Sequence, residues 1–103
     1  MKEVKTMQLM KHMIIVKFLP DFDWKAALPD IKSIFDPAVE IDGVTEVEYL
    51  VSNSERANRS HLIICITCTA EGLKNYDVSA LHKKWKAEYT QFIETKAIFD
   101  CDC

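Results

Sequence analysis

The side chains best suited to chemistry in this chain are its three histidines, His12, His61 and His82. Histidine titrates closest to neutral pH, so it is the usual carrier of protons in catalysis. His12 and His61 each open an apolar run, and Tyr76 shortly precedes His82. We expect His82 and Tyr76 to share one site. The imidazole would accept a proton, and the phenol would orient it or donate to a developing oxyanion.

The expected position of His82 in the first turn of a helix favours this role. The positive end of the helix dipole favours the neutral imidazole, which is the form that acts as a general base. The alternative is a partly buried His82 bonded to the backbone or to Tyr76, with Tyr76 serving only as packing. His12 is a third candidate at the sheet edge of the same cavity, and its alternative is a satisfied histidine at a strand end.

His61 is predicted to be structural or exposed. His12 and His61 open two strands that are expected to run antiparallel, so they should lie at opposite ends of the pair. A strand of eight residues spans about 25 Å, and the two side chains are therefore not expected to share a metal ion. We expect no metal and no cofactor, because the sequence contains no phosphate-binding, dinucleotide-binding or zinc-protease motif.

The four cysteines are predicted to be free thiols. Cys65 and Cys68 form a C-x-x-C pattern, but the stretch reads as a strand, in which residues three apart point to opposite faces. They are therefore not expected to share a metal or a disulfide. We expect Cys65 to face the helices and Cys68 the other side of the sheet. Cys101 and Cys103 lie at the terminal end of the chain.

Length and composition indicate one ordinary domain: 103 residues, 49% hydrophobic and 28% charged. The net charge of −3, with scattered basic residues, provides no surface for nucleic acid or an anionic membrane. No apolar run reaches the roughly 18 residues needed to span a bilayer, and the N-terminus lacks a signal core, so a cytoplasmic location is expected. Residues 1–10 are predicted to be a loosely ordered leader, with Met7 and Met10 as alternative starts, before a single domain over residues 11–103.

The hydrophobic pattern predicts an α+β fold of the ferredoxin-like type. Apolar or alternating runs predict strands over residues 11–18, 44–51, 61–68 and 96–102. Helices are expected over 23–35 and 80–94, with a short turn over 69–76; Asp23, Thr69 and Ser79 are the expected caps. Pro29 predicts a kink or two short helices in the first. The order β-α-β-β-α-β gives one four-stranded antiparallel sheet with both helices on one face.

Three short segments carry a family resemblance, and a fourth extends it. Residues 11–18, K-H-M-I-I-V-K-F, are similar to an opening strand K-H-I-V-x-F-K-F. Residues 41–44, I-D-G-V, are similar to an I-P-G-V turn, with Asp42 in place of proline. Residues 60–65 are similar to a D-H-x-L-V-V strand. Together, over about residues 11–102, they resemble the stress-responsive A/B barrel domain family.

The fourth segment, residues 76–82, resembles that family's Y-x-x-H-P-x-H motif. Ser79 and Ala80 replace the histidine and proline, while the second histidine is kept as His82. The resemblance implies a dimeric α+β barrel. The family includes plant polyketide cyclases such as olivetolic acid cyclase. In that enzyme the histidine matching His82 is a proton-transfer base, and the tyrosine matching Tyr76 orients it. Most members have no assigned activity, so this implication is one of fold-level analogy.

A cavity between sheet and helices is expected to hold a small apolar ligand. Its predicted lining is Ile14, Val16, Ile31, Ile34, Ile63, Leu73, Trp85 and Ile93. Helices in this fold cover one face of the sheet only, and the other face would leave a large apolar patch in water. That second face is therefore expected to form a homodimer. Its predicted residues are Met13, Ile15, Val47, Tyr49, Val51, Leu62, Ile64 and Ile66.

Three functions fit this sequence. The first is a dimeric small-molecule-binding protein, as a cofactor-free cyclase or isomerase that uses a His82/Tyr76 proton-transfer pocket. The second is a non-catalytic, stress-associated binding or structural dimer whose cavity is filled by its own side chains. The third is a cofactor-free monooxygenase of the related dimeric barrels. Trp24 and Trp85 discriminate between them: if both indoles fill the space under the helices, no substrate fits there.

Overall fold

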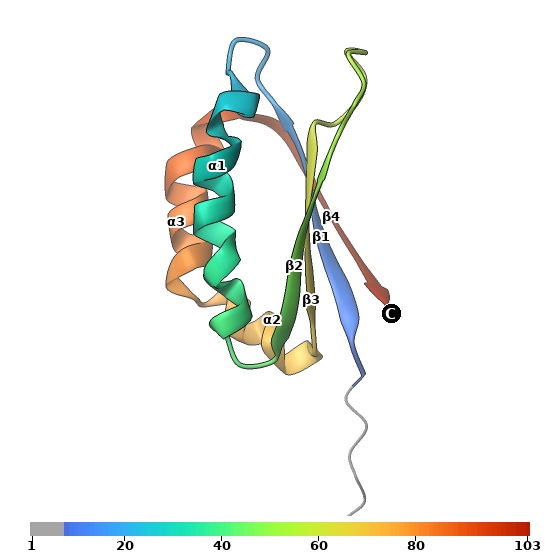
Figure 1. The fold of residues 1–103 in the computed structure, drawn as a ribbon, viewed down its shortest axis with the longest axis vertical. Coiled ribbons are helices and arrows are strands. Elements are labelled where there is room, and N and C mark those ends of the chain that lie inside the picture. Colours follow the sequence, from blue (N-terminus) through green and yellow to red (C-terminus); the bar gives the residue numbers. More distant parts are fainter. Residues whose placement is uncertain (1–7) are drawn as a thin grey trace, which may run out of the picture.

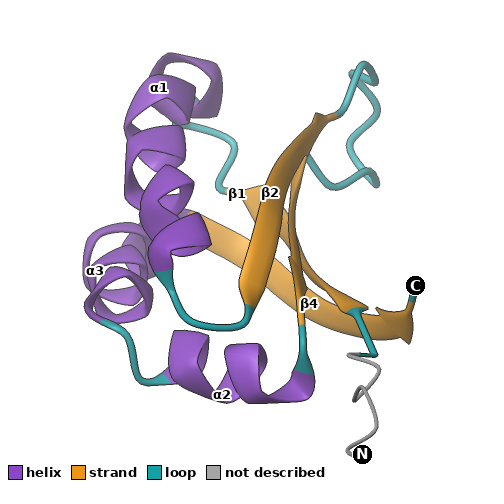
Figure 2. Cartoon of the chain, turned by 60° about the horizontal axis from the view of Figure 1, so that its bottom comes forward, coloured by secondary structure: helices purple, strands orange, loops and turns teal. Residues whose placement is uncertain are grey.

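The chain folds as one four-stranded antiparallel sheet with its helices packed on a single face (Figure 1, Figure 2). The computed structural model describes residues 8–103. The strands are β1 (Met10–Phe18), β2 (Val44–Val51), β3 (Leu62–Cys68) and β4 (Ile93–Asp102), in the sheet order β2-β3-β1-β4. The helices are α1 (Trp24–Phe35), α2 (Ala70–Asp77) and α3 (Ala80–Tyr89). The predicted α+β, ferredoxin-like fold is confirmed.

All three predicted helix caps are confirmed. The side chains of Asp23, Thr69 and Ser79 accept a hydrogen bond from the backbone N–H three residues on, at 3.2, 3.0 and 3.2 Å. Each cap satisfies one of the N–H groups that the first turn of a helix leaves without a partner. The short turn predicted over residues 69–76 is therefore a helix of its own, α2.

Two details of the predicted helices are wrong. Pro29 lies inside α1, which forms one helix from Trp24 to Phe35, so the alternative of two short helices is excluded. The carbonyl that Pro29 leaves without an intrahelical donor belongs to Lys25, and both residues are exposed, so water can supply that bond. The last helix ends at Tyr89 rather than near residue 94, and β4 begins at Ile93, where it pairs with Phe18.

The predicted leader is tested only in part. Residues 1–7, including the alternative start Met7, lie outside the described residues. Met10 is the first residue of β1 and pairs with Cys68 and Asp102, so the strand starts one residue earlier than predicted. No helix of residues 8–103 is long and apolar enough to cross a membrane.

The register of β1 against β3 reverses the predicted faces of two strands. Ile14 pairs with Ile64 and Val16 with Leu62, and directly paired residues share a face of the sheet. Since Ile14 and Val16 point toward the helices, their β3 partners do too. The assignment to the uncovered face is therefore wrong for six residues: Leu62, Ile64, Ile66, Val47, Tyr49 and Val51. Tyr49 illustrates the correction, because its hydroxyl donates to the Asp36 carboxylate at the end of α1, at 2.7 Å.

The uncovered face is instead formed by the other residues of each strand. Met13 and Ile15 lie there as predicted, and their register partners join them: Ile63, Cys65, Ala97 and Phe99, with Leu50 on β2. Leu50 and Phe99 are 52% and 54% exposed. Cys65 and Cys68 do lie on opposite faces, but Cys65 faces away from the helices and Cys68 toward them, the reverse of the prediction. An apolar sheet face thus remains uncovered in the single chain.

Candidate functional site

The predicted pair, Tyr76 and His82, comes together at the junction of α2 and α3. Their ring centroids lie 4.8 Å apart, with the planes tilted by 49°. They are not hydrogen-bonded to each other; the His82 imidazole bonds the backbone carbonyl of Asp77 through Nδ1, at 2.9 Å. A carbonyl only accepts, so Nδ1 carries a hydrogen, and in the neutral ring Nε2 holds the free lone pair. His82 is thus arranged as a proton acceptor.

Tyr76 links His82 to His12. The Tyr76 side chain is 1% exposed, its hydroxyl has no hydrogen-bond partner in the described structure, and burial raises its pKa above the ordinary value. The His12 ring lies 5.7 Å from the Tyr76 ring, and its Nδ1 is 2.6 Å from Oδ1 of Asp100. The structure therefore groups the three predicted catalytic residues. An unpaired buried hydroxyl is unusual enough to require an explanation.

The space under the helices is filled by core side chains. Of the predicted pocket lining, Ile14, Val16, Ile31, Ile34 and Trp85 are buried in one hydrophobic cluster, and Leu73 and Ile93 pack against it. Trp85 is 1% exposed, and its ring meets that of Phe35 at 5.1 Å. Ile63 faces the opposite side of the sheet, so its placement in the pocket is wrong. Trp85 therefore fills the predicted cavity, while Trp24 is partly buried and packs against the same cluster beside Phe18 and His61.

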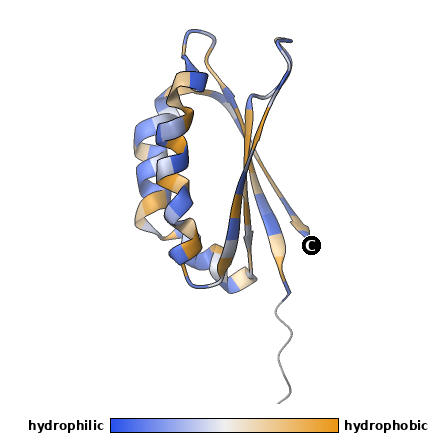
Figure 3. Ribbon diagram, in the orientation of Figure 1, coloured by the Kyte–Doolittle hydropathy of each residue, from blue (hydrophilic) through white to orange (hydrophobic). Residues whose placement is uncertain are grey.

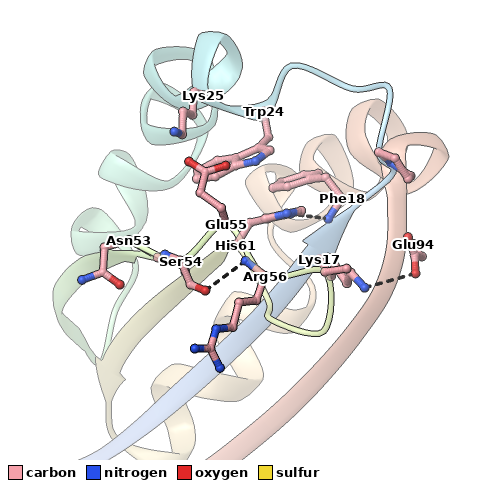
Figure 4. Close-up of a pocket in the computed structure, with 13 residues that line it drawn as sticks. Lys17, Phe18, Trp24, Lys25, Asn53, Ser54, Glu55, Arg56, His61 and Glu94 are labelled. Atoms are coloured by element: carbon pink, nitrogen blue, oxygen red, sulfur yellow. Dashed lines mark hydrogen bonds and ion pairs between the residues drawn. The ribbon is translucent and has the colours of Figure 1, made fainter.

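A pocket of about 250 Å³ opens at the end of the sheet beside the start of α1 (Figure 4). Its walls come from the end of β1, the first turn of α1, the start of β4 and the loop between β2 and β3. That loop is largely hydrophilic (Figure 3). The lining is Lys17, Phe18, Pro20, Trp24, Lys25, Ser52, Asn53, Ser54, Glu55, Arg56, Ala57, His61 and Glu94. None of the three predicted catalytic residues lines it.

His61 is fixed in this pocket by the backbone of β1. The Phe18 backbone N–H donates to Nδ1 of His61 at 3.0 Å. Nδ1 is therefore an acceptor, and the neutral ring must carry its hydrogen on Nε2. Burial, and then the nearby Lys17, lower the pKa of His61, while Glu94 acts in the opposite direction. His61 thus presents an N–H donor, the opposite tautomer to His82.

Two aromatic rings hold the His61 imidazole in place. It stacks on Trp24 with ring centroids 5.0 Å apart, and on Phe18 at 6.1 Å. Trp24 and Phe18 are themselves nearly parallel, with centroids 6.3 Å apart. The three rings come from β1, from α1 and from the end of the loop before β3. Together they form one wall of the pocket, and Figure 4 shows this wall beside Glu55.

The charged groups of the pocket are partly paired. Lys17 lies 3.5 Å from Glu94. The Lys25 ammonium lies 5.8 Å from the centre of the Trp24 ring, within the range of a cation–π contact. Arg56 and Glu55 come from the loop between β2 and β3.

Sequence reasoning missed this pocket because its residues lie far apart in the chain. The basic residues appear scattered along the sequence, and residues 52–60 show no periodicity that would place them. The one available signal was the polar composition of that loop between two apolar strands, since binding residues concentrate in loops on a rigid scaffold.

No family model matches the sequence, and no curated protein matches it. Similar solved structures include a DABB family protein with a ferredoxin-like fold from Mesorhizobium loti, at 18% identity, TM-score 0.70, over 91% of this chain and 95% of that one. Hydroxynitrile lyase from Passiflora edulis is 12% identical, with TM-score 0.74 over 95% of each chain. A dimeric ferredoxin-like protein of unknown function from Thermobifida fusca is 7% identical, with TM-score 0.80 over 99% and 97%. At such identities these likenesses establish the fold alone.

The lowered pKa of His61 predicts a pH dependence of stability. The unfolded chain takes up a proton on His61 near pH 6.5, whereas the folded protein does so only at a lower pH. The free energy of unfolding should therefore fall as the pH drops below about 6.5, and this contribution should level off below the folded-state pKa. Urea unfolding measured between pH 7.5 and 5 tests this.

His61→Asn isolates this contribution. The Asn Oδ1 can replace Nδ1 as acceptor for the Phe18 N–H, but it does not titrate. The variant should therefore lose stability less steeply than the wild type over the same pH range. His82→Asn serves as the control and should keep the His61 contribution. Identical pH profiles for the wild type and His61→Asn would show that His61 does not titrate differently on unfolding.

Proposed function

We propose that this chain is a homodimeric small-molecule-binding protein of the stress-responsive A/B barrel type, with its ligand in the pocket around His61. The observation that carries the proposal is the fixed imidazole, held in one tautomer by the Phe18 N–H and in one orientation by Trp24. Binding pockets combine an apolar wall with a few polar groups of fixed direction. This pocket has both features, and its volume of about 250 Å³ suits a small ligand.

Ligand binding should be detectable at Trp24. A screen of small flat fragments by amide chemical shifts should give perturbations that cluster at Phe18, Trp24 and His61. Trp24→Ala should weaken any hit about tenfold or more, because aromatic contacts of this kind contribute about 1–3 kcal/mol. Ser33→Ala, on the same helix but outside the pocket, should leave binding unchanged. Shifts that cluster elsewhere would place the ligand at another site.

The proposed homodimer forms through the uncovered sheet face. That face exposes Leu50 and Phe99 together with Met13 and Ile15. Each large apolar side chain removed from water contributes about 1.5–3 kcal/mol. A twofold partner presenting the same face buries the patch on both chains. Structures with this fold that are described as dimeric support the proposal.

Light scattering at micromolar concentration should report twice the 11.9 kDa chain mass. Ile15→Asp places a charge on the uncovered face and should give a monomer or an aggregate. Val78→Asp is the matched control, since Val78 is 72% exposed and lies between α2 and α3, away from that face. A monomeric wild type, or equal effects of the two substitutions, would contradict the proposed interface.

Proton transfer by His82 and Tyr76, as in a cofactor-free cyclase or isomerase, is a second candidate. It is favoured by the unpaired Tyr76 hydroxyl and by the free lone pair that the Asp77 bond leaves on His82 Nε2. The buried Trp85 argues for the non-catalytic alternative, because it occupies the space that a substrate would need.

Tyr76→Phe distinguishes these two candidates. A buried hydroxyl without a partner costs free energy, so its removal should raise the free energy of unfolding by about 1 kcal/mol. If a turnover assay is found, the same variant and His82→Ala should both abolish activity while the protein stays folded. A less stable Tyr76→Phe protein would mean that the hydroxyl has a partner, such as a bound water, and is structural.

A further inference from the structure

The charges that line the His61 pocket do not balance. Lys17 and Glu94 neutralise each other at 3.5 Å. Lys25, Arg56 and Glu55 remain, and within residues 8–103 no carboxylate lies at ion-pair distance from either cation. The lining therefore carries one excess positive charge, in a chain whose net charge is −3. An excess of positive charge in the lining favours anions over cations in this pocket.

The hydrogen-bonding groups show the same imbalance. His61 uses Nδ1 to accept the Phe18 N–H, so its Nε2–H remains a donor, and no acceptor for it is found among the described residues. The Lys25 ammonium and the Arg56 guanidinium are donors only. Glu55 is the single charged acceptor left without a cation in the lining. The lining therefore offers the donors of His61, Lys25 and Arg56 against one carboxylate without a paired cation, and a ligand with acceptor groups would engage these donors.

The shape of the pocket restricts the ligand further. The stacked rings of Trp24, His61 and Phe18 form one wall, and flat groups pack best against such a wall. A volume of about 250 Å³ lies below the range of about 300–1,000 Å³ typical of sites for drug-sized ligands. The ligand should therefore be small and flat, with its charge at one end.

We infer that the ligand is a small, flat monocarboxylate, with its carboxylate on the His61 Nε2–H, in a pocket whose lining receives positive charge from Arg56 and Lys25. This inference rests on the proposed binding function and specifies its ligand class. It replaces the purely apolar ligand expected from the sequence. A carboxylate has lone pairs for several donors, and its bond to a guanidinium is among the stronger hydrogen bonds in proteins.

Three probes of one shape test the ligand class. Binding of 2-naphthoate, 2-naphthamide and 2-naphthylmethylamine is measured by calorimetry at low salt and at pH 7.5. At this pH His61 is neutral. The acid should bind at least tenfold more tightly than the amide or the amine. An amide or amine that binds equally well or better would overturn the carboxylate assignment and leave the binding function standing. Binding by none of the three would overturn the proposed binding function as well.

Three variants test the roles assigned to His61 and Arg56. His61→Asn keeps the acceptor for Phe18 but removes the Nε2–H. At pH 7.5 it should weaken 2-naphthoate about tenfold, while the affinity for 2-naphthamide should change less. Arg56→Gln should weaken the acid similarly. Arg59→Gln removes the same charge from the same loop but outside the pocket lining, and should have little effect. Unchanged affinity in His61→Asn, or equal losses in the two arginine variants, would overturn the assignment.

Discussion

The hydrogen bond from the Phe18 backbone to Nδ1 of His61 fixes the geometry on which the pocket depends. This bond lies just beyond the last β1–β3 pair, Val16 with Leu62. There the His61 imidazole takes the place of a strand carbonyl as the acceptor for the backbone N–H. The bond determines the tautomer and sets the plane of the ring, and Trp24 packs on that plane at the start of α1. One side chain thus connects the end of the sheet, the first helix and the loop between β2 and β3. A buried backbone N–H is almost always hydrogen-bonded, so the loss of this acceptor would leave the Phe18 N–H unpaired at a cost in free energy.

His61 and His82 are fixed in opposite tautomers by backbone groups of opposite character. An N–H makes His61 a donor toward its pocket, whereas a carbonyl makes Nε2 of His82 an acceptor. The His61 pocket therefore suits recognition of an acceptor, and His82 suits proton abstraction. These are distinct chemistries at different ends of the fold: His61 lies beyond the start of β3, and His82 lies in α3, which follows the helix at the end of β3.

The sequence predicted the elements well because their signals are local. Asp23, Thr69 and Ser79 cap the predicted helices, and the apolar runs became strands within a few residues of the expected limits. The faces of β2 and β3 were not predicted correctly, since residues 62–66 are apolar at every position and alternation carries no information there. Only pairing with β1 decides which residues face the helices, and a shift by one residue exchanges the whole set. The pocket was missed for a related reason, because its charges meet only through tertiary contacts.

The filled core explains why a ligand site at the strand ends is favoured over one beneath the helices. Trp85, Phe35 and Ile31 are fully buried against the sheet. Opening a cavity large enough for a substrate there would displace side chains whose loss typically costs about 2–5 kcal/mol each. At the strand ends no such cost arises, because loop side chains are already solvated and the aromatic wall is already formed. Proton transfer at Tyr76 would therefore need a rearrangement of the core. The free-energy cost of that rearrangement would be a large part of the stability of a domain of this size, which is about 5–15 kcal/mol. Recognition at His61 requires no such rearrangement of the core.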